Sequence, residues 1–477
     1  MLIFNGLGII QFFLPEFILS IAGFLMLAMG IVTGSKKLYS TITMASLALS
    51  FIVELSFINA SATVFNGSII VNNFGTYFSL LFMISAMLIS VPSMLNISRK
   101  PEIFYALLLF VTTGMLVAAS SSNLIILFVS FEAVSTGTYV MSGFHKTDRT
   151  LEAATKYFFT GAVSTAIIVM GLSYYFEATG TFSLVSPVVT SAQAMLVAMI
   201  LLVIGFGFKL AIFPMHQWAI DTYDGSENSV SAFLSTGSKL VAFMIMMRVF
   251  ISGFIGESYD YYLIFTILAI VTMTYGNLSA LSQTNLKRLL AYSSVAQAGY
   301  LILVFSATGY AQSTSISTTF VYDAIAAGMI YSLVYIFMKG GAFLAMNLSP
   351  NARVELSDIS GLARKSPSLA LAFSILLLSL AGIPFTGGFV SKLFLFLVLI
   401  EVKLWWLAVI AILNSAVSVF YYLRVILVMY RGKPSSEFVV SRSASIPIIA
   451  SAIIIVGLGI YFAIFQTLVG IAGGLFG

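Results

Sequence analysis

Five ionisable residues stand alone inside long apolar stretches of this sequence. Lys209 is the only Lys, Arg, Asp or Glu between Ser191 and Ile220. A lysine at the centre of a bilayer costs roughly 2.5–3.5 kcal/mol on insertion scales, so several in one chain are more than packing requires. Ionisable groups held in hydrocarbon indicate a path for charge. The other isolated residues are Glu132, Lys239, Lys339 and Lys392.

Burial makes a lysine useful for proton transfer, because a surrounding of low dielectric disfavours the charged ammonium. A carboxylate about 6 Å away, at an effective dielectric near 20, stabilises the ammonium by roughly 2.8 kcal/mol. Opening or closing one Glu–Lys pair therefore changes the proton affinity of a lysine about a hundredfold. Moving a proton against about 200 mV costs roughly 4.6 kcal/mol, so one such pair supplies over half of that free energy.

Glu132 has a polar helix face around it. At helical spacing Ser135, Thr136 and Tyr139 share that face, which can hold water. We interpret Glu132 as the carboxylate of a switchable pair with Lys209. The structural alternative is a protonated glutamate that only donates a hydrogen bond to a neighbouring helix.

Two further lysines are candidates for the same path. Lys239 follows Ser231 and Ser235 at helical spacing, which predicts a polar stripe on one helix, and the alternative is a side chain that snorkels to the membrane surface. Lys339 is followed by two glycines, which let water or a neighbouring helix approach its side chain.

The remaining polar residues of the apolar stretches admit both functional and structural interpretations. His216 follows Lys209 by seven residues across Pro214, so it suits a proton relay, but it equally suits a structural hydrogen bond. Arg248 and Arg424 are interpreted as anchors whose long side chains reach the cytoplasmic interface.

The elements that must position these residues are membrane-spanning helices. The chain has 477 residues, of which 60% are hydrophobic and 8% charged, and its apolar runs are long enough to cross a bilayer. The predicted fold is all-α, a polytopic membrane protein of about fourteen spans. They lie near residues 9–31, 40–60, 74–97, 102–119, 122–142, 151–177, 191–221, 228–253, 260–282, 289–307, 320–348, 367–400, 404–430 and 446–470.

Spans 7 and 12 are too long for one straight crossing, and each has a proline near its lysine, Pro214 and Pro384. We therefore expect two broken helices five spans apart, and hence two inverted five-helix repeats of the kind found in transporters. The predicted segments are three N-terminal helices at 1–98, a first repeat of spans 4–8 at 99–255, a second repeat of spans 9–13 at 256–432, and a C-terminal helix at 433–477.

Basic residues set the orientation. The odd-numbered linkers hold fourteen of the 22 Lys and Arg residues, whereas the even-numbered linkers hold only Lys403, so the odd linkers are predicted in the cytoplasm and both termini outside. The linker after span 7 is an exception, because it carries Asp221, Asp224 and Glu227 without a base. This acidic turn either collects protons or is simply solvated.

Composition limits the chemistry available to the chain. It has no cysteine, so thiolate-bound iron–sulfur clusters and disulfides are excluded, and its two histidines are too few for a haem pair or a typical zinc site. No cofactor or metal is expected in this chain, and any redox chemistry must belong to partner subunits.

Several motifs occur in the same order as in a known family. The chain resembles the N subunit of respiratory complex I and its relatives, an antiporter-like family of proton-pumping subunits, over roughly residues 100–430. The segments that carry the resemblance are 102–144, 152–158, FKLAIFPMHQW at 208–218, NLKRLLAYSS at 285–294 and GIPFTGGFVSK at 382–392.

The resemblance implies roles for individual residues. Glu132 and Lys209 match the glutamate of span 5 and the lysine of span 7, Lys239 matches the bridging lysine of span 8, and Lys392 matches the lysine of the exit path in span 12. Relatives often have histidine where this chain has Gln297, which leaves the route through span 10 open.

The predicted function is proton translocation by a membrane subunit of a redox-driven, complex I-type quinone oxidoreductase in a prokaryotic plasma membrane. By resemblance, quinone, flavin and iron–sulfur clusters belong to partner subunits, and antiporter-like homologues, the bilayer and protons are the expected partners, with no nucleic acid. The alternatives are a subunit of a multi-subunit sodium/proton antiporter and a non-pumping structural subunit of the membrane arm.

Overall fold

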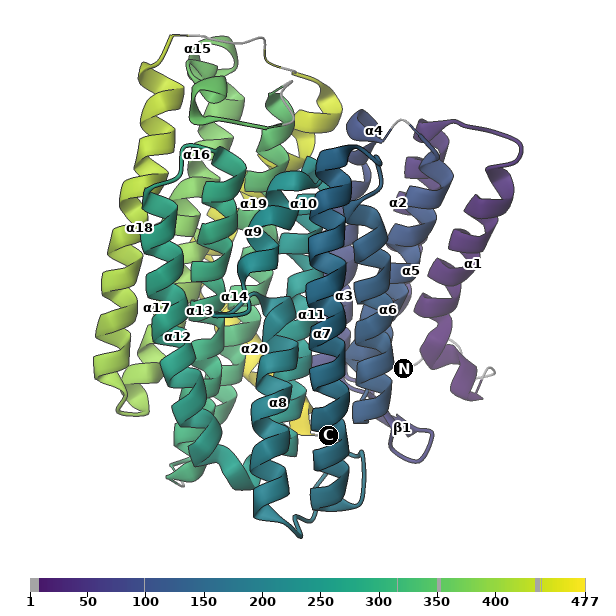
Figure 1. Cartoon of the computed structure of the whole chain (residues 1–477), viewed down its shortest axis with the longest axis vertical. Coiled ribbons are helices and arrows are strands. Elements are labelled where there is room, and N and C mark those ends of the chain that lie inside the picture. Colours follow the sequence, from purple (N-terminus) through teal and green to yellow (C-terminus); the bar gives the residue numbers. More distant parts are fainter. Residues whose placement is uncertain are drawn as a thin grey trace. The chain divides into compact units, whose positions relative to one another are not determined.

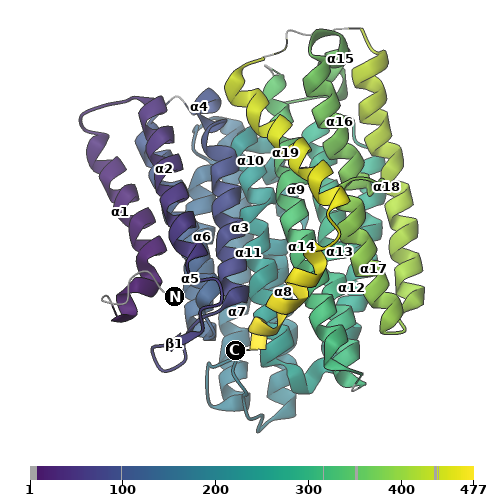
Figure 2. The same cartoon turned by 180° about the vertical axis from the view of Figure 1, so that it is seen from behind.

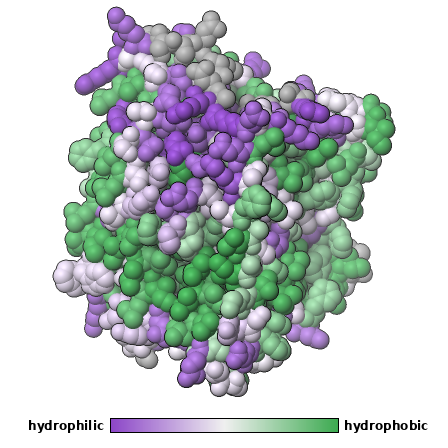
Figure 3. Space-filling view, in the orientation of Figure 1, coloured by the Kyte–Doolittle hydropathy of each residue, from purple (hydrophilic) through white to green (hydrophobic). Residues whose placement is uncertain are grey.

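The computed structural model describes residues 8–97, 99–314, 316–349, 353–433, 438 and 440–476. In this part of the chain, thirteen helices are long and apolar enough to cross a membrane. Figure 3 shows apolar side chains along most of the helical surface and hydrophilic side chains gathered toward one end of the helices. The predicted all-α, polytopic membrane protein is confirmed.

The chain forms two compact units, which we describe separately. Unit 1 comprises Met1–Leu210, Gly237–Glu257 and Ile471–Gly477, and unit 2 comprises Ala211–Thr236 and Ser258–Gly470. Each unit contains helices that pack together, and these helices are not all consecutive in the sequence. The two inverted repeats at 99–255 and 256–432 stay a prediction.

Unit 1 is a bundle in which α7 packs along α8, α5 contacts α6, and α1 lies on α2 and α5 (Figure 1). Its elements are η1 Gly8–Phe13, α1 Leu14–Met29, α2 Lys36–Leu55, β1 Ala62–Val64, β2 Ile69–Val71, α3 Asn73–Ser90, α4 Ser93–Asn96, α5 Pro101–Ser120, α6 Leu124–Ser142, α7 Asp148–Thr179, α8 Ala192–Leu210, α11 Gly237–Met246, η2 Met247–Gly253, η3 Ile255–Glu257 and η6 Gly473–Phe476.

In unit 2, α12 packs along α13, and α14 contacts α13, α16, α17 and α19 (Figure 2). Its elements are α9 Gln217–Gly225, α10 Asn228–Ser235, α12 Ser258–Leu281, α13 Leu286–Ser313, α14 Thr318–Leu344, η4 Ala345–Leu348, η5 Leu356–Ile359, α15 Leu362–Lys365, α16 Pro367–Ala381, α17 Gly387–Glu401, α18 Trp405–Arg431, α19 Arg442–Ile460 and most of α20 Ile464–Ala472.

Both predicted breaks are present, each for a local reason. Span 7 ends as a regular helix at Leu210, the next residue has a φ of 58°, and Pro214 offers no backbone N–H to continue the helix. Span 12 is interrupted after Ala381 by Gly382, whose φ of 86° suits a residue without a side chain. The helical backbone therefore opens close to Lys209 and Lys392.

A third interruption was not predicted. Span 8 is divided at Thr236, whose φ of −114° and ψ of −94° are not helical, so α10 ends at Ser235 and α11 begins at Gly237. The predicted polar stripe joining Ser231 and Ser235 to Lys239 on one helix is therefore wrong, because the serines and the lysine lie on different helices.

Other differences concern short elements. The predicted twelfth span consists of two short helices, α16 and α17, which is why thirteen spans and not fourteen are long enough in the described residues. The predicted last span, 446–470, is divided into α19 and α20. A short antiparallel hairpin, in which Ala62 pairs with Val71, lies between spans 2 and 3 and was not predicted.

Candidate functional site

Lys209 lies at the end of α8, next to the break, with 1% of its surface exposed. Its ammonium has three oxygen neighbours on two other helices of unit 1. The Nζ atom donates to Ser135 Oγ at 3.3 Å, to Thr138 Oγ1 at 3.1 Å and to Tyr157 OH at 2.5 Å. It also lies 5.0 Å from the centre of the Tyr157 ring, in cation–π geometry. Among the described residues, hydroxyl groups and no carboxylate hold this buried charge.

Glu132 lies on α6, one helical turn before Ser135. Helix α6 begins after Asn123, whose side chain caps it by accepting from the backbone N–H of Ile125 at 2.9 Å. The Glu132 Oε1 atom accepts a hydrogen bond from Thr165 on α7 at 2.9 Å. Glu132 and Lys209, both in the described part of the chain, do not form a direct ion pair, but they are close enough to interact electrostatically.

Tyr157 is a member of the candidate site in unit 1 that sequence reasoning missed. It is fully buried on α7, and its hydroxyl lies 3.2 Å from Thr138 Oγ1 and beside Ser238, the residue before Lys239. Its ring makes an edge contact with Tyr139, with 4.5 Å between centroids. Tyr157 therefore reaches from Lys209 toward the helix that carries Lys239, which is itself completely buried.

Lys392 occupies a comparable position in unit 2. It lies on α17 with 3% of its surface exposed, and its Nζ donates to Leu380 O at 3.0 Å, Ala381 O at 3.2 Å and Ser415 Oγ at 3.0 Å. Two of these acceptors are the last carbonyls of α16, so the ammonium caps the end of that helix. The Tyr300 ring lies 4.7 Å from the same ammonium.

A set of polar side chains lies between Lys339 and Lys392 inside unit 2. Lys339 on α14 is completely buried and donates to Ser293. Gln297, one helical turn after Ser293, donates to Leu380 O at 3.1 Å, the same carbonyl that Lys392 uses. The hydroxyl of Tyr331 donates to Gln297 Oε1, and the hydroxyl of Tyr422 lies beside Ser293 and Gln297 without a hydrogen bond to a described residue.

Gln297, at the position where relatives often carry histidine, therefore belongs to this set of polar side chains. Its sequence signal was the departure at Gln297 itself, whereas Tyr331 and Tyr422 gave none, because tyrosines on apolar helices are common. The structure places Lys339 and Lys392 at the two ends of one set of polar side chains, and it brings Glu132 and Lys209 together in another.

His216 is almost completely buried in unit 2, just before α9. It stacks on Phe213, with ring centroids 5.6 Å apart, and meets the edge of Tyr275 at 4.6 Å. These contacts fix the imidazole in an aromatic surrounding. A role in proton relay stays a prediction.

The acidic turn after span 7 is not a free cluster of carboxylates. Arg288 forms an ion pair with Asp221 at 3.0 Å, Asn285 donates to Asp224 at 2.9 Å, and Lys287 donates to Ser226 O at 2.6 Å. The start of α13 therefore supplies the basic and amide groups that the linker itself lacks. This arrangement favours the structural interpretation of the turn.

The interpretation of Arg248 as a surface anchor is wrong, because only 3% of its surface is exposed and it donates to Ala119 O at 2.6 Å. Arg424 is half-buried and donates to two carbonyls at and just after the end of α12. Glu54 stands isolated in span 2 of the sequence, and the neighbour that sequence reasoning missed is Glu16: both line one small cavity of about 20 Å³ together with Thr76 and Ser79. In the described residues, no group of three or more His, Cys, Asp or Glu side chains is arranged to hold a metal ion.

Comparison with known proteins gives consistent matches. The family model described as NADH:quinone oxidoreductase/Mrp antiporter, TM, matches residues 121–418. The chain is 38% identical to F(420)H(2) dehydrogenase subunit N of Methanosarcina mazei, with 94% of each chain covered, and 36% identical to NADH-quinone oxidoreductase subunit N of Trichlorobacter lovleyi, with 92% of each covered. It is also similar to a chain of respiratory complex I from Thermus thermophilus, with a TM-score of 0.82, 31% identity, and 94% and 97% of the two chains covered.

Proposed function

This chain belongs to the NADH:quinone oxidoreductase/Mrp antiporter family, as an antiporter-like membrane subunit of a complex I-type oxidoreductase, and we propose that it translocates protons through its buried lysines. The observation that carries the proposal is the surrounding of Lys209: a buried ammonium held by three hydroxyl groups, with Glu132 in electrostatic range. Such a group can give up and regain a proton without leaving the protein interior.

In unit 1, Glu132 and Lys209 act as the switchable pair. When the carboxylate is charged and near, it stabilises the ammonium, and when the two separate, the buried lysine releases its proton more readily. The intervening hydroxyls of Ser135, Thr138 and Tyr157 both donate and accept hydrogen bonds, so they can pass the proton on. Lys239 is the acceptor of this proton in the proposal.

In unit 2, the polar chain from Lys339 to Lys392 forms the outlet. Ser293, Tyr422 and Gln297 lie between the two lysines, and each of these side chains can donate and accept a hydrogen bond. Gln297 and Lys392 both donate to Leu380 O, which only accepts, so proton transfer to Lys392 requires one of the neighbouring side chains to rotate toward its nitrogen. Lys392, beside the break of span 12, is the last protein group on this path.

The driving reaction in this proposal is electron transfer in partner subunits. The relatives named above are a dehydrogenase subunit and an NADH-quinone oxidoreductase subunit, and we assign quinone, flavin and iron–sulfur clusters to the chains that assemble with this one. The antiporter-like homologues of such assemblies are its expected neighbours. With the basic linkers in the cytoplasm, protons would move from the cytoplasmic to the outer side.

Two other functions have some support. The matching family includes Mrp antiporters, so exchange of sodium for protons is a second candidate. Lys392 also caps a helix end, as a purely structural lysine would. A sodium gradient that drives proton movement without any reductant would favour the antiporter, and full pumping after neutralisation of all four lysines would favour the structural subunit.

The test is the replacement of Lys209→Met and, separately, Glu132→Ala in the intact complex. Losing a Coulomb interaction of about 2.8 kcal/mol predicts that coupled turnover falls roughly ten- to a hundredfold. Proton-to-electron stoichiometry in proteoliposomes is the measurement. Lys403→Met, which removes an exposed lysine in a linker, is the control and should pump normally. An unchanged stoichiometry in both test variants would refute the assigned roles.

A further inference from the structure

Arg248 is a buried charge that the proposed proton path does not use. Its guanidinium lies 5.0 Å from the centre of the Phe74 ring and donates to Ala119 O at 2.6 Å, while its Nε atom is buried without a hydrogen-bond partner among the described residues. In the same part of the chain, it forms no ion pair with a carboxylate. An uncompensated buried charge is costly, so a guanidinium in this position calls for an anion.

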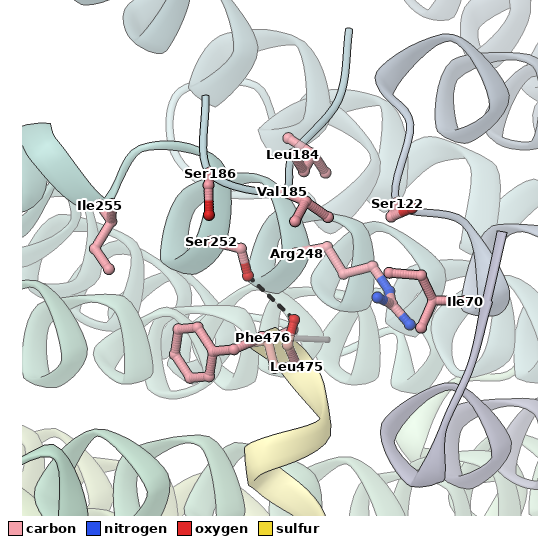
Figure 4. A pocket seen from close by; sticks show the side chains of 10 residues that line it. All are labelled: Ile70, Ser122, Leu184, Val185, Ser186, Arg248, Ser252, Ile255, Leu475 and Phe476. Carbon is pink, nitrogen blue, oxygen red and sulfur yellow. Dashed lines mark hydrogen bonds between the residues drawn. The ribbon is translucent and has the colours of Figure 1, made fainter. Parts of the chain in front are cut away.

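The same guanidinium lines a cavity of about 170 Å³ (Figure 4). One buried water needs about 10–15 Å³, so the cavity has room for a polyatomic group. Three serines line it together with Arg248. Ser122 and Ser252 already donate their single hydroxyl hydrogens to the carbonyls of Gly67 and Leu475, so the groups left to donate to a phosphate oxygen are the guanidinium and the hydroxyl of Ser186.

The walls of the cavity are fixed by the backbone. Leu184 N donates to Ser122 O at 2.9 Å, and Ser252 Oγ donates to Leu475 O at 3.2 Å, so segments far apart in the sequence are held together around the cavity. Gly75 lets Arg248 approach Ala119, because a Cβ at that position would lie 2.9 Å from Ala119 O. The site is therefore formed before any ligand arrives, which lowers the entropic cost of binding.

The mouth of the cavity has the opposite character from its interior. Val185 and Ile255 line it and are 49% and 51% exposed, whereas Arg248 and Ser122 are nearly fully buried. By the predicted orientation, the linkers that form it are on the outer side of the membrane. An apolar rim around a polar, cationic interior fits an amphiphile whose phosphate enters and whose chains stay at the rim.

We propose that this cavity of unit 1 is a phosphate-binding site, with Arg248 as the cationic ligand and Ser186 as the hydroxyl donor. The phosphate belongs either to the headgroup of an anionic phospholipid or to the free inorganic ion. The site is separate from Glu132, Lys209 and the other residues of the proton path, so its occupancy can be tested without measuring pumping.

The test uses the purified full-length chain in detergent, titrated with phosphatidylglycerol, with inorganic phosphate, and with diacylglycerol that has the same acyl chains but no phosphate. Native mass spectrometry counts the bound molecules. A hydrogen bond to a charged group contributes about 1.5–3 kcal/mol, so Arg248→Gln should weaken binding of the phosphate compound by roughly tenfold or more. Arg424→Gln, which removes a guanidinium outside this cavity, is the control and should bind as the original chain does.

A second variant covers the case in which Arg248→Gln does not fold. Val185→Trp adds bulk at the exposed mouth and leaves the guanidinium in place. If the ligand is a lipid, this variant should bind phosphatidylglycerol several-fold more weakly than the original chain does. If the ligand is the free ion, the original chain should bind inorganic phosphate, and acyl chains should not increase the affinity. Equal affinity for diacylglycerol and phosphatidylglycerol, binding unaffected by Arg248→Gln, or no binding of either phosphate compound would overturn the proposal.

Discussion

Lys209 and Lys392 both donate hydrogen bonds to oxygen atoms, but the oxygen atoms belong to different chemical groups. Lys209 has three hydroxyl neighbours, whereas Lys392 has two backbone carbonyls and one hydroxyl. A hydroxyl both donates and accepts, but a carbonyl only accepts. The surroundings of Lys209 thus suit both forms of the lysine, whereas those of Lys392 favour the ammonium.

Gln297 offers a prediction at the scale of one residue. Gln297→Leu removes both its hydrogen bonds, to Leu380 O and from Tyr331, so it should interrupt the polar chain in unit 2 and lower coupled proton pumping several-fold. Gln297→His should retain most of the pumping, because an imidazole also donates and accepts. Proton uptake and quinone reduction in proteoliposomes measure both effects.

The matched control is Gln283→Leu, which removes a glutamine that donates to Ser279 O at the end of α12, away from this chain of residues. Pumping by Gln297→Leu at the level of this control would contradict a role for Gln297. A loss of pumping in the histidine variant as large as in the leucine variant would point to packing as the function of the side chain.

The charged members of the site could be identified from the sequence, but the neutral ones could not. A lysine or glutamate inside an apolar run is visible because it is rare and costly there. Tyr157, Ser415 and Tyr422 could not be recognised in this way, since hydroxyl groups occur at many positions of apolar helices, where serine and threonine can bond to their own backbone. Only the packing of α6, α7 and α8, or of α13, α17 and α18, reveals which of them face a lysine.

At the scale of helices, the close contact between α16 and α17 gives a stability prediction. A Cβ on Gly388 would overlap the carbonyl of Ser379, and the Gly388 N–H donates to Ser379 Oγ at 3.0 Å, which holds the two helices at this distance. Gly388→Ala should therefore destabilise the protein by about 1–3 kcal/mol, as overpacking does. Thermal unfolding in detergent, followed by circular dichroism, measures the shift.

Gly457→Ala is the control for this substitution. Gly457 lies within α19, where an added Cβ would meet no atom within 4 Å, so alanine should be neutral or slightly stabilising through its helix propensity. If Gly388→Ala unfolds at the same temperature as Gly457→Ala, the two halves of span 12 are not packed as described.

The breaks of spans 7 and 12 could be predicted because proline and excess length mark them. The break at Thr236 could not, since neither proline nor excess length marks it, and a short run of small polar residues such as Ser235 to Ser238 also occurs inside unbroken membrane helices. The hairpin after span 2 was also missed, because its strands have only three residues each. Short irregular elements of this kind depend on tertiary contacts that a hydropathy profile does not contain.

At the scale of the whole molecule, the distribution of basic residues predicts the orientation in the membrane. The absence of cysteine makes a clean test possible, because any thiol introduced is the only one. Val188→Cys, in the linker after α7, should react with a membrane-impermeant maleimide in intact cells, whereas Asp148→Cys, at the start of α7, should react only after the membrane is permeabilised. Both positions are exposed. Reversed labelling would mean that the basic linkers lie outside.

The all-helical class and the positions of most spans could be predicted from hydropathy, because the cost of burying polar groups in lipid limits what a span can contain. The division into two compact units could not be predicted, because it follows packing: residues 211–236 belong to unit 2, although the residues on both sides of them belong to unit 1. A hydropathy profile shows which segments span the membrane, but it does not show which of these segments pack against one another.

The contacts of Lys392 limit how its proton can leave. An ammonium carries three hydrogens, one for each of its three acceptors, and Ser415 gives its own hydrogen to Ala381 O at 3.0 Å. A neutral amine has only two hydrogens and a lone pair, which would then face an oxygen atom. When Lys392 loses its proton, Ser415 must therefore rotate its hydroxyl hydrogen toward the lysine nitrogen. The orientation of the Ser415 hydroxyl thus depends on whether Lys392 is charged.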